Sequence, residues 1–347
     1  MIAQYKKHVL HFKRPSGTSR GILVEKETWF LILTQGEKKG IGECGLLRGL
    51  SIDDQPDYEA KLAWVCANIH LGKDALYESL TAYPSIQMGI EMAFLSLHQV
   101  DSFSLFPSSF SAGASKIPIN GLIWMGDQKF MLDQVEKKLA QGFSCIKMKV
   151  GAIDFLEEVE ILKAIRKRYS ADKMVLRVDA NGAFEHDPLE KLSILADLDL
   201  HSIEQPIPQG NWEKMKALCK VSPLPIALDE ELIGVFDKAE KIALLETICP
   251  QYIILKPSFI GGFQGAEEWT NLARERGIDA WVTSALESNV GLNAIAQWAF
   301  HHGFQGHQGL GTGSLFKNNV PAPLEIKNGY INIDKTLAWR PIDQLLS

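Results

Sequence analysis

The chain has 347 residues, of which 46% are hydrophobic and 22% are charged. This composition supports a large core and excludes an intrinsically disordered, collagen-like or coiled-coil protein. The net charge is −6, from 42 acidic and 36 basic residues. An acidic balance argues against a nucleic-acid-binding face, and no apolar run reaches the length of a membrane helix.

Five cysteines are scattered without a C-x-x-C pair, which is typical of reduced thiols rather than of disulfides or a zinc site. The first fifteen residues lack the apolar stretch of a signal peptide, because Lys6, Lys7 and His8 precede only two apolar residues. We therefore expect a cytoplasmic protein that does not insert into membranes.

The N-terminal part reads as an α+β unit over residues 1–112. Short alternating runs such as 28–33 predict antiparallel strands, with turns expected at 15–17 and 35–37. Residues 57–100 then show helical spacing that is interrupted near Pro84. Strands followed by helices are typical of an α+β arrangement.

Residues 113–318 change pattern, because apolar runs, mostly of four to six residues, alternate with amphipathic segments such as 154–169 and 265–276. Eight such runs predict a modified (β/α) barrel, capped by the N-terminal unit. Residues 319–347 do not continue the alternation, and we expect them to pack back on the cap. The eight runs are 117–124, 145–150, 174–178, 200–204, 225–228, 252–255, 280–283 and 303–310.

Charged residues stand at the carboxyl ends of the middle strands, where a barrel builds its active site. The series is Lys149, Asp179, Glu204, Asp229 and Lys256, and successive members are separated by 30, 25, 25 and 27 residues. Each gap is one βα unit, so all five side chains should reach the same rim. Strand alternation also places Lys147 beside Lys149, and Arg177 beside Asp179.

Three neighbouring carboxylates between two lysines favour a hard cation, Mg²⁺ with Mn²⁺ as the alternative, because the ligands are oxygen only. A lysine near such an ion and a second ammonium group is a candidate base for removing a proton α to a carboxylate, and the metal would stabilise the resulting enediolate. Taken singly, a strand-end acid is more often a helix N-cap, and paired lysines are more often a solvated edge. The ordered series of five favours the functional interpretation.

These motifs resemble the enolase superfamily, specifically its muconate-lactonizing subgroup and, within it, the o-succinylbenzoate synthase family. The resemblance spans essentially the whole chain. Three segments carry it within the subgroup: RVDANG at 177–182, SALESN at 284–289 and GLGTGSLF at 309–316. Enzymes of that family dehydrate 2-succinyl-6-hydroxy-2,4-cyclohexadiene-1-carboxylate to 2-succinylbenzoate in menaquinone biosynthesis.

The resemblance implies a role for each site residue. Lys149 would be the general base that removes the α proton and returns it to the departing hydroxyl on the same face. Lys256 would stabilise the enediolate from the other side of the ring. Asp179, Glu204 and Asp229 would hold Mg²⁺, and the residues around them would be Lys147, Arg177, Asn181 and Glu230.

Substrate binding is expected at the ends of the last two strands. Ser284 and backbone N–H groups near Gly311 and Gly313 are candidates for the succinyl carboxylate. Loops near residues 15–20 and 45–50 are candidate lids, although ordinary surface hairpins account for them equally well. The expected partner is a small carboxylate, and the oligomeric state is left open.

Three alternatives stay open. An N-acylamino acid racemase or a dipeptide epimerase would use the same lysines and metal, although residues 311–313 lack the acid that epimerases carry there. Muconate cycloisomerase is weaker. A metal-free aldolase with a Schiff-base lysine is more remote, because it would not need three acids.

Overall fold

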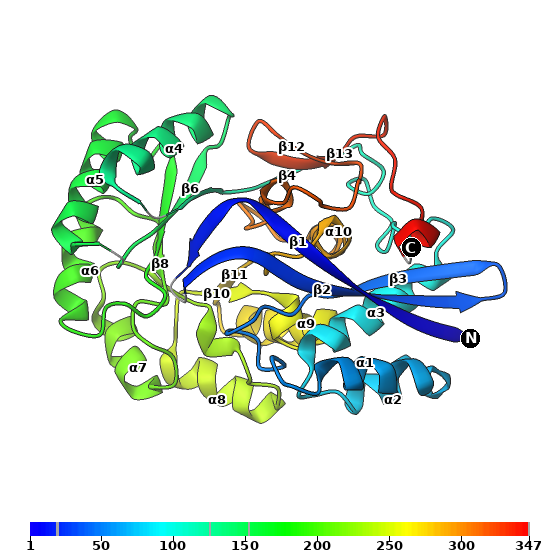
Figure 1. Ribbon diagram of the computed structural model, residues 1–347. Helices are drawn as coiled ribbons and strands as arrows, with labels where there is room; N and C mark the ends of the chain where they lie inside the picture. Colours follow the sequence, from blue (N-terminus) through cyan, green and yellow to red (C-terminus); the bar gives the residue numbers. More distant parts are fainter. Residues whose placement is uncertain (19–20, 125, 152, 346–347) are drawn as a thin grey trace.

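The computed structural model describes residues 1–18, 21–124, 126–151 and 153–345. Figure 1 shows a capping unit whose long β-ribbon reaches across to a barrel ringed by helices. Within the described residues, no helix is long and apolar enough to cross a membrane.

The cap begins with an antiparallel sheet in the order β1–β2–β3. Alternation along β2 gives the sheet two buried faces: Trp29 and Leu31 pack against the cap helices, whereas Phe30 and Ile32 join the barrel core. The strands are β1 (Ile2–Thr18), β2 (Gly21–Gln35) and β3 (Lys38–Cys44), and the helices are α1 (Tyr58–Ala67), α2 (Lys73–Glu78) and α3 (Pro84–His98). The expected strands-then-helices order is confirmed, and Pro84 is the first residue of α3.

The turn expected at residues 35–37 is present, because Gln35 pairs with Lys38 across it. The turn expected at 15–17 is wrong. Strand β1 runs on to Thr18, and pairing with β2 shifts in register between His11 and Ser16. Pro15 lies in this interval and cannot donate to the ladder, so it interrupts the pairing without ending the strand.

Over the described residues, the barrel contains seven parallel strands in sequential order from β5 to β11. Helices alternate with them and form the outer ring in Figure 1. In chain order the elements are β5 (Gly121–Ile123), α4 (Gln128–Ala140), β6 (Cys145–Lys149), α5 (Phe155–Arg168), β7 (Val175–Asp179), α6 (Pro188–Ala196), β8 (Ser202–Glu204), α7 (Trp212–Val221), β9 (Ile226–Leu228), α8 (Lys238–Ile248), β10 (Tyr252–Leu255), α9 (Gly262–Glu275), β11 (Asp279–Val282) and α10 (Asn289–His301).

The first and last predicted barrel strands differ from expectation. The run 117–124 is divided into β4 (Ile117–Pro118) and β5, because β4 pairs with a C-terminal strand. The run 303–310 forms only two isolated bridges, Gln308 to Ile119 and Gly309 to Thr283, and these close the barrel. Gly309 permits this approach, since a Cβ there would lie 1.8 Å from Thr283 Oγ1.

The C-terminal segment contacts both units. Strands β12 (Leu324–Lys327) and β13 (Tyr330–Ile333) form a hairpin that pairs with β4. Trp339 stacks on Phe103 with ring centroids 4.1 Å apart. Short 3₁₀ turns complete the chain: η1 (Ile69–Leu71), η2 (Glu230–Leu232), η3 (Pro257–Phe259), η4 (Gly313–Leu315) and η5 (Ile342–Leu345).

Candidate active site

The strand register brings the charged series to one rim of the barrel. Lys149, Asp179 and Glu204 are Cα partners across β6, β7 and β8. Asp229 and Lys256 directly follow β9 and β10 on the next strands. Parallel strands end at the same edge, so one βα unit per charged residue produces a single cluster.

The lysines hold the three carboxylates directly. Lys147 Nζ lies 2.9 Å from Asp179 Oδ2 and 2.5 Å from Glu204 Oε2, so one ammonium group contacts two acids. Lys149 Nζ lies 3.1 Å from Asp179 Oδ2, and Lys256 pairs with Asp229. The acids are at most 3% exposed, and buried charges of this kind require such partners.

Burial and these contacts shift the pKa values of the two acids Asp179 and Glu204 in opposite directions. Burial alone would raise the pKa of Asp179, but Lys147 and Lys149 hold it well below its ordinary value. Burial and the adjacent Asp179 raise the pKa of Glu204 well above its ordinary value. Burial alone would lower the pKa values of Lys147 and Lys256, but the neighbouring carboxylates raise both. Both lysines are therefore held as ammonium ions.

The donor set fits a divalent cation by its chemistry. Glu204 Oε1 is buried and has no hydrogen-bond partner, and its carboxylate lies among other acids. An oxygen atom in this state has an unused lone pair and favours a positive ligand. Among the described residues, no three His, Cys, Asp or Glu side chains are grouped closely enough to hold a metal ion. Lysine ammonium groups contact the acids instead.

Two amide side chains connect neighbouring strand ends. Asn181 accepts a hydrogen bond from Lys149 Nζ and donates one to Glu230 Oε1 at 3.0 Å. Gln205, which sequence reasoning did not select, accepts a hydrogen bond from the backbone N–H of Asp229 at 3.3 Å. Both residues have positive φ, 44° and 39°, so each turns the chain sharply after its strand.

Arg177 lies one side-chain layer below the acids, inside the barrel. Its guanidinium stacks 4.1 Å from the Trp281 ring centroid and donates to the His307 carbonyl at 2.9 Å. The sequence placed Arg177 beside the metal ligands because it shares a strand face with Asp179. Two residues along a strand correspond to about 6.6 Å, which is enough to put it in the next layer.

The expected substrate-binding residues gather at the ends of the last two strands. Ser284 Oγ lies 2.5 Å from Thr312 Oγ1, so Thr312 is a site neighbour that the sequence argument missed. A Cβ on Gly313 would lie 2.7 Å from Asn289 Oδ1 and 2.9 Å from Leu292 Cδ2, so these side chains would have to shift. A Cβ on Gly311 would make only ordinary contacts, with the Asn120 carbonyl and Ile119 Cδ1.

The two candidate lid segments differ. In the segment 15–20, residues 15–18 belong to β1, and Ser19 and Arg20 lie outside the described residues. The segment 45–50 is held in place, because Arg48 pairs with Glu27 and Asp54 at 2.6 Å each.

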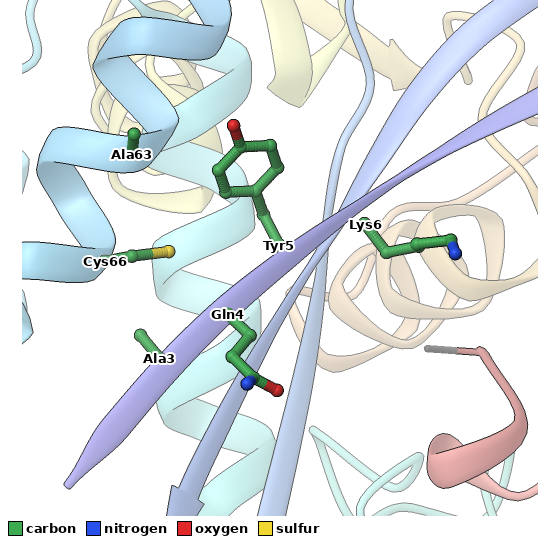
Figure 2. Close-up of a pocket in the computed structure, with 6 residues that line it drawn as sticks. All are labelled: Ala3, Gln4, Tyr5, Lys6, Ala63 and Cys66. Carbon is green, nitrogen blue, oxygen red and sulfur yellow. The ribbon is translucent and has the colours of Figure 1, made fainter. Parts of the chain in front are cut away.

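Two hollows lie away from the barrel rim. One, of about 490 Å³, lies between β1 and α1; Figure 2 shows its lining by Ala3, Gln4, Tyr5, Lys6, Ala63 and Cys66. The other, of about 430 Å³, borders Phe103, Gln297 and Trp339. Neither is lined by a residue of the charged cluster.

Comparison with known proteins identifies the family. Residues 131–337, more than half of the chain, match the model described as enolase C-terminal domain-like. The chain belongs to the enolase superfamily. It is 43% identical to an o-succinylbenzoate synthase of Desulfotalea psychrophila, over 96% of this chain and 99% of that protein. The expected family is confirmed, and the chain is an enzyme of this superfamily.

Solved structures agree with the fold. The crystal structure of MenC from Desulfotalea psychrophila LSv54 matches with a TM-score of 0.85 and 40% identity, over 96% of this chain and 99% of that chain. Muconate lactonizing enzyme from Pseudomonas fluorescens matches with a TM-score of 0.82 and 21% identity, over 99% and 97%. The second likeness supports the fold alone. The expected capped, modified barrel is confirmed.

Proposed function

We propose that this enzyme dehydrates 2-succinyl-6-hydroxy-2,4-cyclohexadiene-1-carboxylate to 2-succinylbenzoate, with Mg²⁺ as cofactor. The observation that carries the proposal is the 43% identity, over nearly the full length of both chains, to an o-succinylbenzoate synthase. The gathering of three lysines and three acids at one rim supplies the groups that this reaction needs.

Lys149 is the base in this proposal. A proton moves from the ring carbon next to the carboxylate to Nζ of Lys149, and the electron pair of that C–H bond delocalises onto the carboxylate. As this pair returns to form the ring double bond, the C–O bond to the hydroxyl breaks and the same proton passes to the leaving oxygen. Water departs and leaves an aromatic ring. Lys147 does not fit this role, because two carboxylates hold it as an ammonium ion.

Lys256 acts as a fixed positive charge. Asp229 raises its pKa, so it stays protonated while negative charge develops on the substrate carboxylate. A preorganised ammonium group in a buried site stabilises that charge with little reorganisation. Asp179, Glu204 and Asp229 would hold the Mg²⁺. When bound, the ion supplies a Lewis acid that polarises the substrate carboxylate.

The state of Lys256 also separates this reaction from racemisation. A racemase or epimerase needs a base on each face of the reacting carbon, whereas a dehydratase with acid and base on one face needs only one. The pairing of Lys256 with Asp229 favours the second scheme. The absence of an acid at residues 311–313 also disfavours a dipeptide, whose ammonium group would need one.

The substrate class and the location follow as further parts of the proposal. A small dicarboxylate suits a site that carries several ammonium groups. The five cysteines are all free, which supports the reducing environment of the cytoplasm.

A direct assay tests the proposed function. The purified enzyme with Mg²⁺ should consume the cyclohexadiene and remove its absorbance. Lys149→Ala and Lys256→Ala should each lower kcat by about 10²- to 10⁴-fold, because each removes a group required at the transition state. Lys163→Ala is the matched control, since Lys163 is an exposed lysine on α5 that pairs with Glu160, and it should keep full activity.

Other outcomes would point to the alternatives. Turnover of N-succinyl amino acids without dehydration would replace the proposed reaction with racemisation. Activity that survives EDTA, together with borohydride trapping of a lysine adduct, would indicate a Schiff-base aldolase.

A further inference from the structure

A buried charge cluster joins the cap to the barrel beside the candidate active site. It consists of Lys26 on β2, Glu43 on β3 and Glu287 in the loop between β11 and α10; we refer to these three residues as the interdomain cluster. Their exposures are 3%, 0% and 0%, so all three are removed from solvent. Burying three charges is costly unless each is compensated, and the proposed chemistry uses none of them.

Glu287 connects the two loops that carry Lys256 and Ser284. Its Oε1 accepts a hydrogen bond from Ser258 Oγ at 2.7 Å, and Ser258 lies two residues after Lys256. Its Oε2 accepts one from the backbone N–H of Ala285 at 2.7 Å, directly after Ser284. One carboxylate therefore fixes the distance between the two strand ends.

Glu43 holds the same loop from the side of the cap. It accepts hydrogen bonds from the backbone N–H of Ser288 at 2.8 Å, from Ser288 Oγ at 2.5 Å and from the backbone N–H of Gly291 at 2.7 Å. Thr28 Oγ1 of the cap donates a fourth, at 2.8 Å. A carboxylate that is fully occupied in this way has one position only.

Lys26 faces the two acids without bonding to either of them. Its Nζ is buried without a hydrogen-bond partner among the described residues. Burial lowers its pKa, and Glu43 and Glu287 oppose this lowering. Lys26 therefore does not fix the orientation of either carboxylate.

The side chain of Glu287 is tightly packed between Gly45 and Gly291. A Cβ on Gly45, in the cap loop, would lie 3.1 Å from Glu287 Cγ, and one on Gly291 would lie 2.7 Å from Glu287 Cβ. Leu286 has φ of 66°, a left-handed conformation that costs free energy and persists only where neighbours enforce it. The loop is therefore held in a conformation that it would not adopt alone.

We propose that Glu287 is a positioning residue that sets Lys256 and Ser284 relative to each other, and that Glu43 makes this setting depend on docking of the cap. The inference rests on the proposed function for its kinetic consequence. A displacement of about 1 Å at a reacting group lowers the rate by up to about 10²-fold. A small movement of Lys256 or Ser284 after loss of a contact in the interdomain cluster should therefore be measurable in kcat.

Substitutions at both ends of the Ser258–Glu287 hydrogen bond test the first part. Glu287→Ala and Ser258→Ala should lower kcat by about 10- to 100-fold, measured well below the melting temperature of each variant. Glu287→Gln should restore most of the rate, because its amide oxygen can accept from Ala285 and its NH₂ can donate to Ser258 Oγ. Ser96→Ala is the control, since it removes another buried serine hydroxyl, in the cap, and should keep kcat.

A second readout does not depend on the substrate. The rate at which an amine reagent labels Lys256, measured by mass spectrometry, should rise several-fold in Ser258→Ala and stay unchanged in Ser96→Ala. Lys256 is suited to this probe because its side chain is only 14% exposed and is paired with Asp229. Wild-type protein without dehydratase activity would defeat the proposed function, while the labelling would still decide the positioning role. The inference would be overturned if kcat stayed unchanged in Glu287→Ala and Ser258→Ala and the labelling of Lys256 stayed unchanged in Ser258→Ala.

The role of the cap is tested by comparing two of its carboxylates. Glu91 on α3 also binds backbone N–H groups of the barrel, those of Phe263 at 2.6 Å and Gln264 at 3.0 Å, at the start of α9. Glu43→Gln should lower kcat and expose Lys256 to labelling, because an amide NH₂ would face the Gly291 N–H. Glu91→Gln should lower the melting temperature and leave kcat and labelling unchanged. Equal loss of kcat in both variants would show that cap docking in general, and not the interdomain cluster, matters.

Discussion

At the scale of the residue, Glu204 is the clearest sign of what the site binds. It is a buried carboxylate between two other acids, one of its oxygens has no partner, and its pKa is raised well above the ordinary value. When it is ionised and no metal ion is bound, its repulsion with the two neighbouring acids opposes folding, and Lys147 offsets this only in part. A divalent ion bound beside Glu204 should therefore stabilise its ionised carboxylate strongly.

The Glu204→Gln variant should therefore show two effects of opposite sign. Without metal, its melting temperature should equal or exceed that of the wild type, because repulsion from Asp179 and Asp229 is relieved. With Mg²⁺ at a hundredfold excess over its Kd, the wild type should gain about 2.7 kcal/mol of stability, and the variant should lose this gain. Thermal unfolding with and without Mg²⁺ measures both. An undiminished Mg²⁺ effect in the variant would remove Glu204 from the ligand set.

At the scale of the element, local signals set most helix boundaries. The helix predicted over 154–169 is observed as α5, and Asp154 caps it by accepting from the backbone N–H of Leu156. The helix predicted over 265–276 is observed as α9, but it begins three residues earlier, at Gly262. Gly261 and Gly262 give no local sign of a helix start. The first N–H groups of α9 are instead bound by the carboxylate of Glu91, which belongs to the N-terminal unit. Glu91 is remote from Gly262 in the chain, so the local sequence gives no signal of this partner.

An isolated capping residue on the outer ring should affect stability alone. Asp237 caps α8 by accepting from the backbone N–H of Glu240 at 3.0 Å. Asp237→Ala should lower the free energy of unfolding by about 1 kcal/mol, while Asp237→Asn should lose little. Urea unfolding together with kcat checks this. A fall in kcat for Asp237→Ala would mean that α8 contributes to the site.

At the scale of the whole molecule, the cap docks through buried carboxylates on barrel helices. Glu43 binds the start of α10 and Glu91 the start of α9, and both contacts join residues far apart in the chain. Carboxylates at helix N-termini are favoured by the helix dipole as well as by the N–H groups. Burial nevertheless raises the pKa of Glu91 to about 7 and that of Asp53, behind the cap loop, to about 6.

This arrangement predicts a pH dependence of stability. Because the folded-state pKa of Glu91 is above its ordinary value of 4.5, the folded protein binds more protons than the unfolded chain between about pH 4.5 and 7. The free energy of unfolding should therefore fall as pH rises through this window, by about 1.4 kcal/mol per pH unit. Chemical unfolding at a series of pH values measures the slope. Glu91→Gln should flatten it, and an unchanged slope would exclude Glu91 as its source.

The sequence by itself determined the order of elements and the identity of the charged series. Strand periodicity and the spacing of about one βα unit are local properties, so they place Lys149, Asp179, Glu204, Asp229 and Lys256 at one rim without knowledge of any contact. The subgroup motifs likewise predicted the family that the comparisons confirm.

Only the tertiary structure decided how these residues are held. Several contacts of the site join segments that are remote in sequence. They are the pairing of Lys147 with two acids, the position of Arg177 in the layer below, the contact of Thr312 with Ser284, and the link from Glu43 to the loop of Glu287. Their positions depend on side-chain reach and on the docking of the cap, and neither leaves a periodic trace in a single chain. The barrel closure at Gln308 and Gly309 is of the same kind, because two isolated bridges are too short to form a pattern.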